Sequence, residues 1–589
     1  MRQFFKFTFA SALGFLLTFI VLILILFGII SSAISFAEDK TVLVSDNSIL
    51  SLKLNTPVTD RGVAQPSFGD FASFAEKPVG LNDILKNIKK ASADEKIKGI
   101  YINITEPKAG IATLQEIRNA LKEFKKSGKF IISYAENYSQ ASYYIASVSD
   151  KVYLNPEGAI LFKGLNAEIM FYKNLLEKID VEAQIIRHGK FKSAVEPFFL
   201  EKMSKANKEQ TKKYISSIWN ELVNAISESR KISVEELNNI ADKLLLETAN
   251  DAVKYQFADK LLYKDEIIAL LRNKAGINKN EKLSVVTMKQ YVDAIVPKLR
   301  KTVPRNKIAV IYAQGSIKSG EGEDLVIGSE KISRLIRKAR KDSTIKAIVF
   351  RVNSPGGSAL ASDVMWRETV LAAKTKPFVV SMGDVAASGG YYISCAADSI
   401  FASPTTITGS IGVFGVIPNF QGLVTDKIGI TFDHVKTNEN SGFFSVNRPL
   451  TKFERNIIQK SVETIYDSFI TKVSVGRDLT KEQVDNIGQG RVWAGSDAKE
   501  IGLIDAFGGL NRAILSASRM AKIENNYRIV EYPKTLEPLE KIINELKGND
   551  KTIALKTELG PLYSYYSYLK EMYEMKGVQA RLPYEINIY

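Results

Sequence analysis

The first forty residues differ from the rest of the chain in how apolar and polar positions follow one another. Residues 7–37 carry no charged side chain, and residues 15–30 are apolar almost throughout. A membrane-spanning helix needs about 20 such residues, whereas the apolar part of a cleaved signal peptide usually has only ~7–15. The length of the stretch therefore favours a retained transmembrane helix over a removed leader, and we find no second stretch of sequence long enough to span.

The charges that flank this stretch predict its orientation. Arg2 and Lys6 precede it, while Glu38 and Asp39 follow it. Because basic residues near a span stay in the cytoplasm, the N-terminus is expected there and everything after residue 40 is expected to be exported.

Beyond residue 40, short strands rich in β-branched residues alternate with helical segments. In the best-defined stretch the pattern predicts strands at 345–352, 377–382 and 399–402, and helices at 358–373 and 387–397. This alternation is typical of an α/β fold with buried parallel strands.

The same pattern occurs twice, at a fixed offset of 248 positions. Residues 94–100 (DEKIKGI) align with residues 342–348 (DSTIKAI). Further matched pairs are Pro107 and Pro355, Tyr143 and Tyr391, Asp150 and Asp398, Pro156 and Pro404, and Gly164 and Gly412. A period this long is far beyond that of a solenoid and indicates a duplicated domain.

We therefore expect an α/β protein made of tandem duplicated domains behind an N-terminal transmembrane helix. The predicted segments are an anchor at 1–40, a first repeat at 41–275, a linker at 276–307, a second repeat at 308–530 and a C-terminal tail at 531–589. The tail is rich in tyrosine, which favours a role in packing or assembly.

Composition narrows the range of partners. The 589 residues exceed one ordinary core, and the net charge is +15. Basic residues are scattered, and no zinc-finger or RNP-like pattern is present, so no nucleic-acid partner is expected. No cofactor and no metal site are expected. A Ser-His-Asp triad or a multi-histidine site would have to use His188 and His434, since these are the two histidines of the sequence.

Each repeat lacks something that the other has. The second repeat has small or hydroxyl residues where the first has larger ones: Ser388 against Gln140, Gly356-Gly357 against Lys108-Ala109, and Ser410 against Phe162. The first repeat has Lys192 where the second, in a looser alignment, has Asn440. Neither repeat has both the serine with its glycines and the lysine, whereas a site shared between the two repeats would have both.

Ser388 is a candidate nucleophile. It lies at a predicted strand-to-helix turn in Ala-Ala-Ser-Gly-Gly, and its small neighbours admit a substrate backbone. The N–H of Gly389, with that of Gly356 or Gly357, would form an oxyanion hole, for which glycine allows close approach. The same short motif also fits a small-residue helix packed on a sheet, so the motif alone does not show that Ser388 is catalytic.

A serine needs a base, and Lys192 is the candidate. A lysine acts as a base only when neutral; since its ordinary pKa is about 10.4, reaching pH 7 costs roughly 4 kcal/mol, which burial between domains would supply. Lys190 lies two residues away, and the residues alone do not choose between the two.

Other polar residues leave alternatives open. Ser410 either holds the lysine amine on Ser388 or is a turn residue in a glycine-rich loop. A histidine base is conceivable, but no acidic partner pattern supports His188 or His434. Asp384 and Glu196 are expected to be structural hydrogen-bonding residues.

Taken together, these motifs resemble the signal peptide peptidase A (protease IV) family in its long, duplicated bacterial form. The segments that carry the resemblance are Lys192–Pro197, Asn353–Gly357, Gly383–Tyr391 and Thr408–Gly412. Val385 is a mild departure at a position that is usually aromatic in the family. The resemblance covers nearly the whole chain.

The resemblance implies a serine endopeptidase with a Ser/Lys dyad across the two halves. It implies Ser388 as nucleophile, Lys192 rather than Lys190 as base, and Ser410 as the residue that orients the lysine. It also implies a crotonase-like (Clp-type) fold, a homotetramer, and cleavage of remnant signal peptides and other apolar peptides.

The expected location is the bacterial inner membrane, with a single span at residues 7–37 in lipid and the catalytic domains in the periplasm. Two alternatives remain at this point: an acyl-CoA hydratase or isomerase of the same fold superfamily, and a non-catalytic membrane scaffold with a decayed dyad.

Overall fold

The computed structural model describes most of the chain and leaves several segments out. It describes residues 2–37, 44–62, 78–278, 281–292, 294, 304–322, 325–534 and 578–582. The tyrosine cluster predicted in the tail, at residues 563–573, lies outside the described residues.

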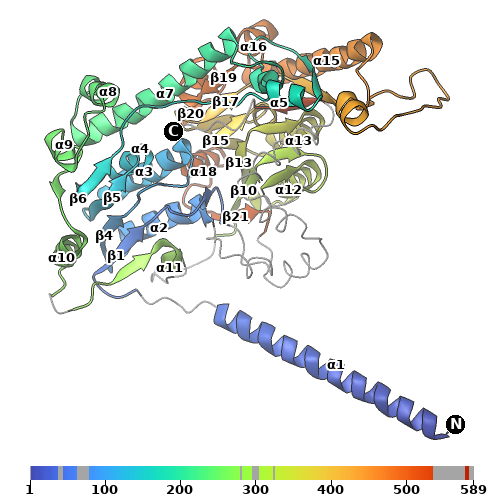
Figure 1. Cartoon of the computed structure of the whole chain (residues 1–589). Helices are drawn as coiled ribbons and strands as arrows, with labels where there is room; N and C mark the ends of the chain where they lie inside the picture. Colours follow the sequence, from blue (N-terminus) through green and yellow to red (C-terminus); the bar gives the residue numbers. More distant parts are fainter. Residues whose placement is uncertain are drawn as a thin grey trace.

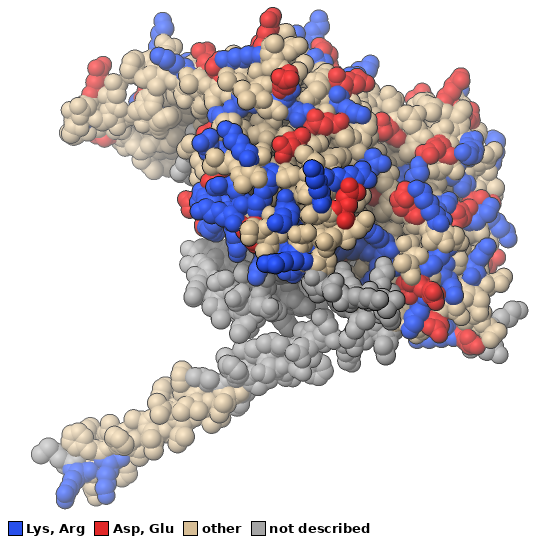
Figure 2. Space-filling view, turned by 180° about the vertical axis from the view of Figure 1, so that it is seen from behind, with Lys and Arg blue, Asp and Glu red and all other residues tan. Residues whose placement is uncertain are grey.

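A long helix, α1 (Arg2–Ala37), precedes the folded part of the chain (Figure 1). At about 1.5 Å per residue it is roughly 54 Å long, which exceeds the ~30 Å hydrocarbon core of a bilayer. Among the described residues it contains the one helix long and apolar enough to cross a membrane. Figure 2 shows no charge along its described side chains except basic residues at the N-terminal end, which are Arg2 and Lys6.

The first repeat is built on a parallel sheet with strand order β8-β6-β5-β4-β1-β9. Its strands are β1 (Ser48–Leu52), β4 (Ile97–Ile102), β5 (Phe130–Tyr138), β6 (Lys151–Ile160), β8 (Lys260–Leu261) and β9 (Val285–Thr287). Helices α2 (Leu81–Ala93), α3 (Ile111–Lys125) and α4 (Gln140–Ala146) connect them. Strands β1 and β4 are buried along nearly their whole length, as is typical of parallel strands covered on both faces.

The second repeat has a larger sheet, parallel except for the edge strand β19, which pairs antiparallel with β17. Its main path runs β19-β17-β15-β13-β10-β21, formed by β10 (Lys307–Gln314), β13 (Ile345–Ser354), β15 (Phe378–Ala387), β17 (Ile407–Gly409), β19 (Val492–Ala494) and β21 (Arg528–Tyr532). The short strands β16 (Ser399–Ala402) and β20 (Ala506–Phe507) extend it beside β15. Helices α12 (Ser329–Lys341) and α13 (Ala359–Ala373) flank β13 (Figure 1).

The predicted duplication is confirmed in the helices and strands. Helices α2 and α12 begin at Leu81 and Ser329 and have the same length, and α3 and α13 begin at Ile111 and Ala359 and also match in length. Both pairs, together with strands β4 and β13, keep the offset found in the sequence. The α/β class with two repeats is therefore confirmed, whereas the limits of the five predicted segments stay a prediction.

One predicted helix is wrong in extent. Instead of spanning 387–397, helix α14 covers Gly389–Tyr392, because β15 continues to Ala387. After that single turn, Ser394 Oγ donates to Gly390 O at 2.7 Å, and such side-chain bonding to the backbone competes with a regular helix.

A third sheet, with both parallel and antiparallel pairs, contains strands from both repeats. Its order is β12-β11-β14-β22-β18-β7, with β7 (Glu182–Arg187) from the first repeat and β11 (Ser316–Lys318), β12 (Val326–Gly328), β14 (Gly356–Ser358) and β18 (Phe414–Asn419) from the second. The remaining strand, β22 (Gln579–Arg581), comes from the C-terminal segment. A long helix, α7 (Lys205–Arg230), runs from the first repeat to β19 of the second (Figure 1).

Candidate active site

Ser388 lies at the sharp turn between β15 and α14. Its backbone has φ +54° and ψ −112°, an unusual conformation for a residue other than glycine. The Ser388 N–H donates to Gly409 O at 2.8 Å, which fixes the turn against β17. The side chain is fully buried. Strained backbone of this kind occurs often at functional sites and here aims one hydroxyl at a defined point.

Lys192 reaches the same point from the first repeat. It lies between β7 and a single 3₁₀ turn, Ser193–Val195, and it is fully buried. Its Nζ is 3.0 Å from Ser388 Oγ, although the two residues are 196 positions apart in sequence. The half-sites predicted from the two repeats therefore meet.

The surroundings of Lys192 disfavour its charged form. Burial holds the pKa of the amine well below its ordinary range, and desolvation is the cause. The Phe414 ring centroid lies 5.8 Å from Nζ, and we find no carboxylate paired with this amine among the described residues. A neutral amine has a lone pair, which is the requirement for accepting a proton from a hydroxyl.

Ser410 completes the environment of the amine. Its Oγ lies 3.1 Å and its carbonyl oxygen 3.4 Å from Lys192 Nζ. The Ser410 N–H donates to Arg491 O at 2.7 Å, so the loop after β17 is held in place. Ser388 Oγ also lies 3.3 Å from Gly412 O. Ser410 thus contacts the amine that the resemblance expects it to orient, while its effect on catalysis stays a prediction.

The three candidate oxyanion glycines lie close to Ser388. Gly356 has φ +97°, and a Cβ built on it would lie 2.7 Å from Gly389 N, so a larger residue would clash there. A Cβ on Gly357 would lie 2.1 Å from Ile317 O. The Gly356 N–H donates to Ser354 Oγ at 3.1 Å, and Gly357 is paired with Ala580 of β22, so the Gly389 N–H at the start of α14 is the strongest candidate oxyanion donor of the three.

The other candidate bases suggested by the sequence are Lys190, His188 and His434. Lys190 is exposed, with its amine over the Phe191 ring, and His434 is exposed in a loop. The His188 ring stacks on Tyr466 with ring centroids 3.9 Å apart.

The two acidic candidates have structural partners. Asp384 accepts hydrogen bonds from the backbone and side chain of Thr113. Glu196 accepts from Ser204 N and Asn207 Nδ2, at 3.1 and 3.0 Å. Both therefore make the structural hydrogen bonds that we expected of them.

Two residues that position Lys192 were missed by the sequence reasoning. Gln210, on α7, donates to Phe191 O and Ser193 Oγ on either side of the lysine, while its Oε1 accepts from Val492 N of the second repeat. Gly490 has φ +83°, and a Cβ built there would lie 2.6 Å from Lys192 Cα. The Gly488-Gln489-Gly490 run was a visible signal of a tight backbone approach, whereas Gln210 carried no local signal.

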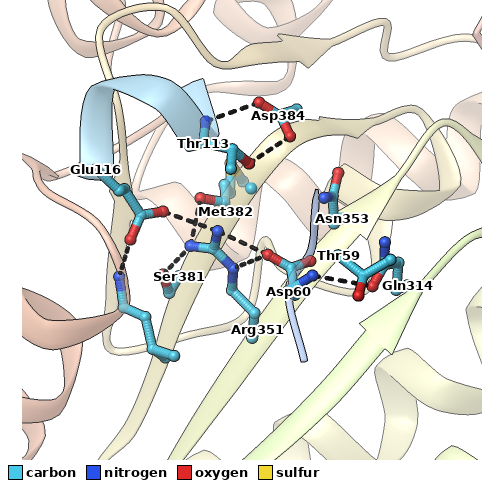
Figure 3. Close-up of polar contacts among 12 residues, drawn as sticks. Thr59, Asp60, Thr113, Glu116, Gln314, Arg351, Asn353, Ser381, Met382 and Asp384 are labelled. Atoms are coloured by element: carbon cyan, nitrogen blue, oxygen red, sulfur yellow. Dashed lines mark hydrogen bonds and ion pairs between the residues drawn. The ribbon is translucent and has the colours of Figure 1, made fainter. Parts of the chain in front are cut away.

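A buried ion cluster joins the two repeats (Figure 3). Arg351, on β13, pairs with Asp60 at 2.8 Å and with Glu116 at 2.7 Å, and its side chain is 1% exposed. Glu116 also accepts from Leu510 N at 3.0 Å, and burial raises the pKa of its carboxyl despite the nearby Arg351. Both acids come from the first repeat. Because β13 leads directly into the glycines of β14, this cluster fixes the first repeat to the strand that precedes them.

The chain matches known proteins over most of its length. The sequence profile of peptidase family S49 matches twice, at residues 123–278 and 371–524, once in each repeat. Protease 4 of Haemophilus influenzae is 36% identical over 532 residues, covering 87% of this chain and 85% of that protein. The chloroplastic serine protease SPPA of Arabidopsis thaliana is 32% identical over 551 residues, covering 92% and 78%.

Shorter relatives match one repeat. A putative signal peptide peptidase SppA of Enterococcus faecium is 31% identical over 233 residues, covering 38% of this chain and 67% of that protein. Among solved structures, a mutant of the 1510-N membrane-bound stomatin-specific protease aligns with a TM-score of 0.26 at 14% identity, covering 38% of this chain and 97% of that one.

The family profile covers both repeats, and the two long relatives span most of the chain at 36% and 32% identity. The chain therefore belongs to peptidase family S49 and is a serine protease.

Proposed function

We propose that this protein is a membrane-anchored endopeptidase with a Ser/Lys dyad, in which Ser388 is the nucleophile and Lys192 the general base. The observation that carries the proposal is the 3.0 Å separation of Lys192 Nζ and Ser388 Oγ in a site where both side chains are fully buried. Membership of a serine peptidase family argues against the acyl-CoA and scaffold alternatives.

The proposed reaction follows from these contacts. The neutral Lys192 amine takes the Ser388 proton as Oγ attacks the peptide carbonyl, and the N–H of Gly389, with that of Gly356 or Gly357, stabilises the oxyanion. The ammonium then gives its proton to the departing amine, leaving an acyl-enzyme. Lys192, neutral again, takes a proton from water as the water oxygen attacks the ester, and it returns that proton to Ser388 Oγ as the acyl group leaves as a carboxylic acid. Ser410 keeps the amine directed at Ser388 throughout.

We further propose that the substrates are apolar peptides, including remnant signal peptides, cut at the extracytoplasmic face of the inner membrane. The Enterococcus faecium relative is a putative signal peptide peptidase, which supports this class of substrate. Ala386, Ala387 and Gly389 crowd the nucleophile, which supports small residues at the scissile position. The apolar helix α1, with Arg2 and Lys6 at its start, supports a cytoplasmic N-terminus and one span. A homotetramer remains part of the proposal and is measurable by light scattering in detergent.

Labelling with a fluorophosphonate tests the nucleophile. Wild type is expected to react, Ser388→Ala to lose the label, and Ser410→Ala to keep it. Equal labelling of Ser388→Ala and wild type would refute the assignment. Peptide hydrolysis that persists in Lys192→Met would assign the base to another group.

A further inference from the structure

Basic side chains gather at the edge of the second repeat's sheet where its parallel strands begin. Strands β10, β13 and β21 start in register there, because Lys307 lies opposite both Ile345 and Arg528. Helices α12 and α13 end at the same edge, since they lead into β13 and β15. The solvent-accessible cations of this basic edge are Lys307, Lys341, Lys346, Lys374, Lys376 and Arg528.

Few carboxylates balance the cations of the basic edge. Asp342 lies 3.9 Å from Lys307 Nζ, and Asp398 accepts from a backbone N–H at the start of β15. The pKa of Lys376 is lowered, first by burial and also by neighbouring cations. Among the described residues no carboxylate is paired with Lys341, Lys346, Lys374 or Arg528. The basic edge therefore has a surplus of positive charge.

The matching edge of the first repeat provides an internal comparison. Lys374 has a counterpart there, Lys126, that is paired with Glu123 at 2.8 Å. A second pair at that edge joins Lys125 and Asp150, also at 2.8 Å. The fold thus allows the cations of such an edge to be paired with carboxylates, and the surplus is particular to the second repeat.

The basic edge lies on the side of the molecule from which α1 extends. Figure 2 shows Lys and Arg gathered over the lower part of the second repeat, and α1 lies below the folded part in both views. Helix α1 ends at Ala37 and β1 begins at Ser48, so the connecting chain of about 11 residues spans at most ~40 Å. The anchor therefore keeps the folded part close to the bilayer surface.

We propose that the basic edge is a docking surface for anionic lipid headgroups, which holds the second repeat against the bilayer beside its anchor. This inference rests on the proposed anchoring by α1 and not on the dyad. Clustered Lys and Arg residues are attracted to an anionic leaflet over a range of about one Debye length, ~8 Å at physiological ionic strength.

Docking at this edge also sets the position of the active site. Ser388 follows the last residue of β15, whose 10 residues span about 33 Å. The dyad therefore lies at the opposite end of the strands from the basic edge. A docked molecule holds Ser388 up to ~33 Å from the headgroups, on the side that faces the aqueous phase.

A fluorophore at Ser343 reports docking in the full-length protein. Ser343 is exposed in the turn between α12 and β13, whereas the single cysteine, Cys395, is buried, so Ser343→Cys is labelled selectively. The labelled protein is reconstituted into vesicles containing a lipid with a nitroxide on its headgroup, which quenches the fluorophore near contact. We expect quenching in mixed phosphatidylglycerol and phosphatidylcholine vesicles. It should be lost in phosphatidylcholine alone, and in about 1 M salt, where the Debye length is ~3 Å.

Charge reversal at the basic edge gives the decisive comparison. Each basic residue near an anionic surface favours docking about fivefold, so reversing three of them should lower the ratio of docked to free molecules at least about 100-fold. The test variant combines Lys341→Glu, Lys346→Glu and Lys374→Glu. The control makes the same change of net charge at exposed lysines of α7, α8 (Val234–Lys243) and α15 (Lys452–Arg477), by combining Lys212→Glu, Lys243→Glu and Lys460→Glu. The control should be quenched like wild type.

Equal quenching with and without phosphatidylglycerol, or an equal loss in the two triple variants, would refute the docking surface. A failure of the proposed anchoring is recognised separately, because the protein would then not float with either kind of vesicle in a density gradient. Ser388→Ala should be quenched like wild type, which separates docking from catalysis.

Discussion

Replacing Arg351 by methionine tests how strongly the buried cluster holds the two repeats together. Arg351 is paired with Asp60 and Glu116, and all three side chains are at most 4% exposed. Methionine keeps much of the volume but leaves two buried carboxylates without their cation. Removing one partner of a buried ion pair costs about 3–5 kcal/mol.

This loss is large enough to measure by thermal unfolding. For a cooperative unit the size of one repeat, each kcal/mol lowers Tm by about 2–4 °C, so the variant should melt roughly 6–20 °C below wild type. Peptide hydrolysis should fall as well, since β13 carries Arg351 and leads into Gly356. Adding Glu116→Gln to the variant should restore part of the lost Tm.

The pH dependence of this effect has a definite sign. Removing Arg351 removes an interaction that lowers the pKa of Glu116, so that pKa rises further in the folded variant. A carboxyl whose folded pKa is raised binds its proton more tightly when folded, so acidification favours the folded state. The Tm difference from wild type should therefore be largest near neutral pH and shrink as the pH is lowered.

The exposed pair Arg334 and Glu321 provides the control. Both side chains are more than half exposed, and exposed ion pairs contribute little to stability. Arg334→Met should melt close to wild type. A Tm for Arg351→Met as high as that of Arg334→Met would refute the reasoning that the buried cluster fixes the repeats.

Four further predictions concern the dyad. Lys192→Met should abolish peptide hydrolysis yet raise Tm, because the variant no longer has to lose a proton from a buried amine when it folds. In wild type the free-energy cost of deprotonating Lys192 on folding disappears as the pH rises toward the ordinary lysine pKa. The gain in Tm should therefore shrink at alkaline pH. The acidic limb of wild-type kcat/KM should fall about tenfold per pH unit below the lysine pKa, and a peptidase activity with the same limb in Lys192→Met would contradict this. Gly490→Ala should lower kcat/KM about 100-fold by displacing Lys192, whereas Gly276→Ala, at a positive φ with open space, should not; equal effects would show that only backbone strain matters. Ser410→Ala removes one hydrogen bond and should lower kcat up to about tenfold while fluorophosphonate labelling persists, and loss of the label would indicate a collapsed site.

The sequence predicted the features that repeat or that are local. The fixed offset between the repeats predicted paired helices, and α2 and α12 follow it residue for residue. The difference between the repeats at Ser388 and Lys192 predicted a shared site, and the two side chains do meet. The predicted strand at 399–402 coincides with β16.

The missed features depend on contacts between distant segments. Arg351 occupies an apolar strand, and nothing nearby in sequence identifies Asp60 and Glu116 as its partners. Gln210 acts on a loop of its own repeat and on Val492 of the other. Strand β22 lies in a segment that we expected to serve packing or assembly, and its pairing with β14 has no sequence signature because the ladder is made of main-chain atoms.

In the proposed mechanism, the division of the dyad between the repeats also determines when the enzyme becomes active during its own production. A growing chain that has emerged only as far as α7 contains the amine of Lys192 but no hydroxyl for it to deprotonate. The amine-bearing loop gains its last anchor only when Val492 arrives to bond Gln210. A nascent molecule is therefore unable to cut its neighbours, or itself, until nearly the whole chain has been synthesised.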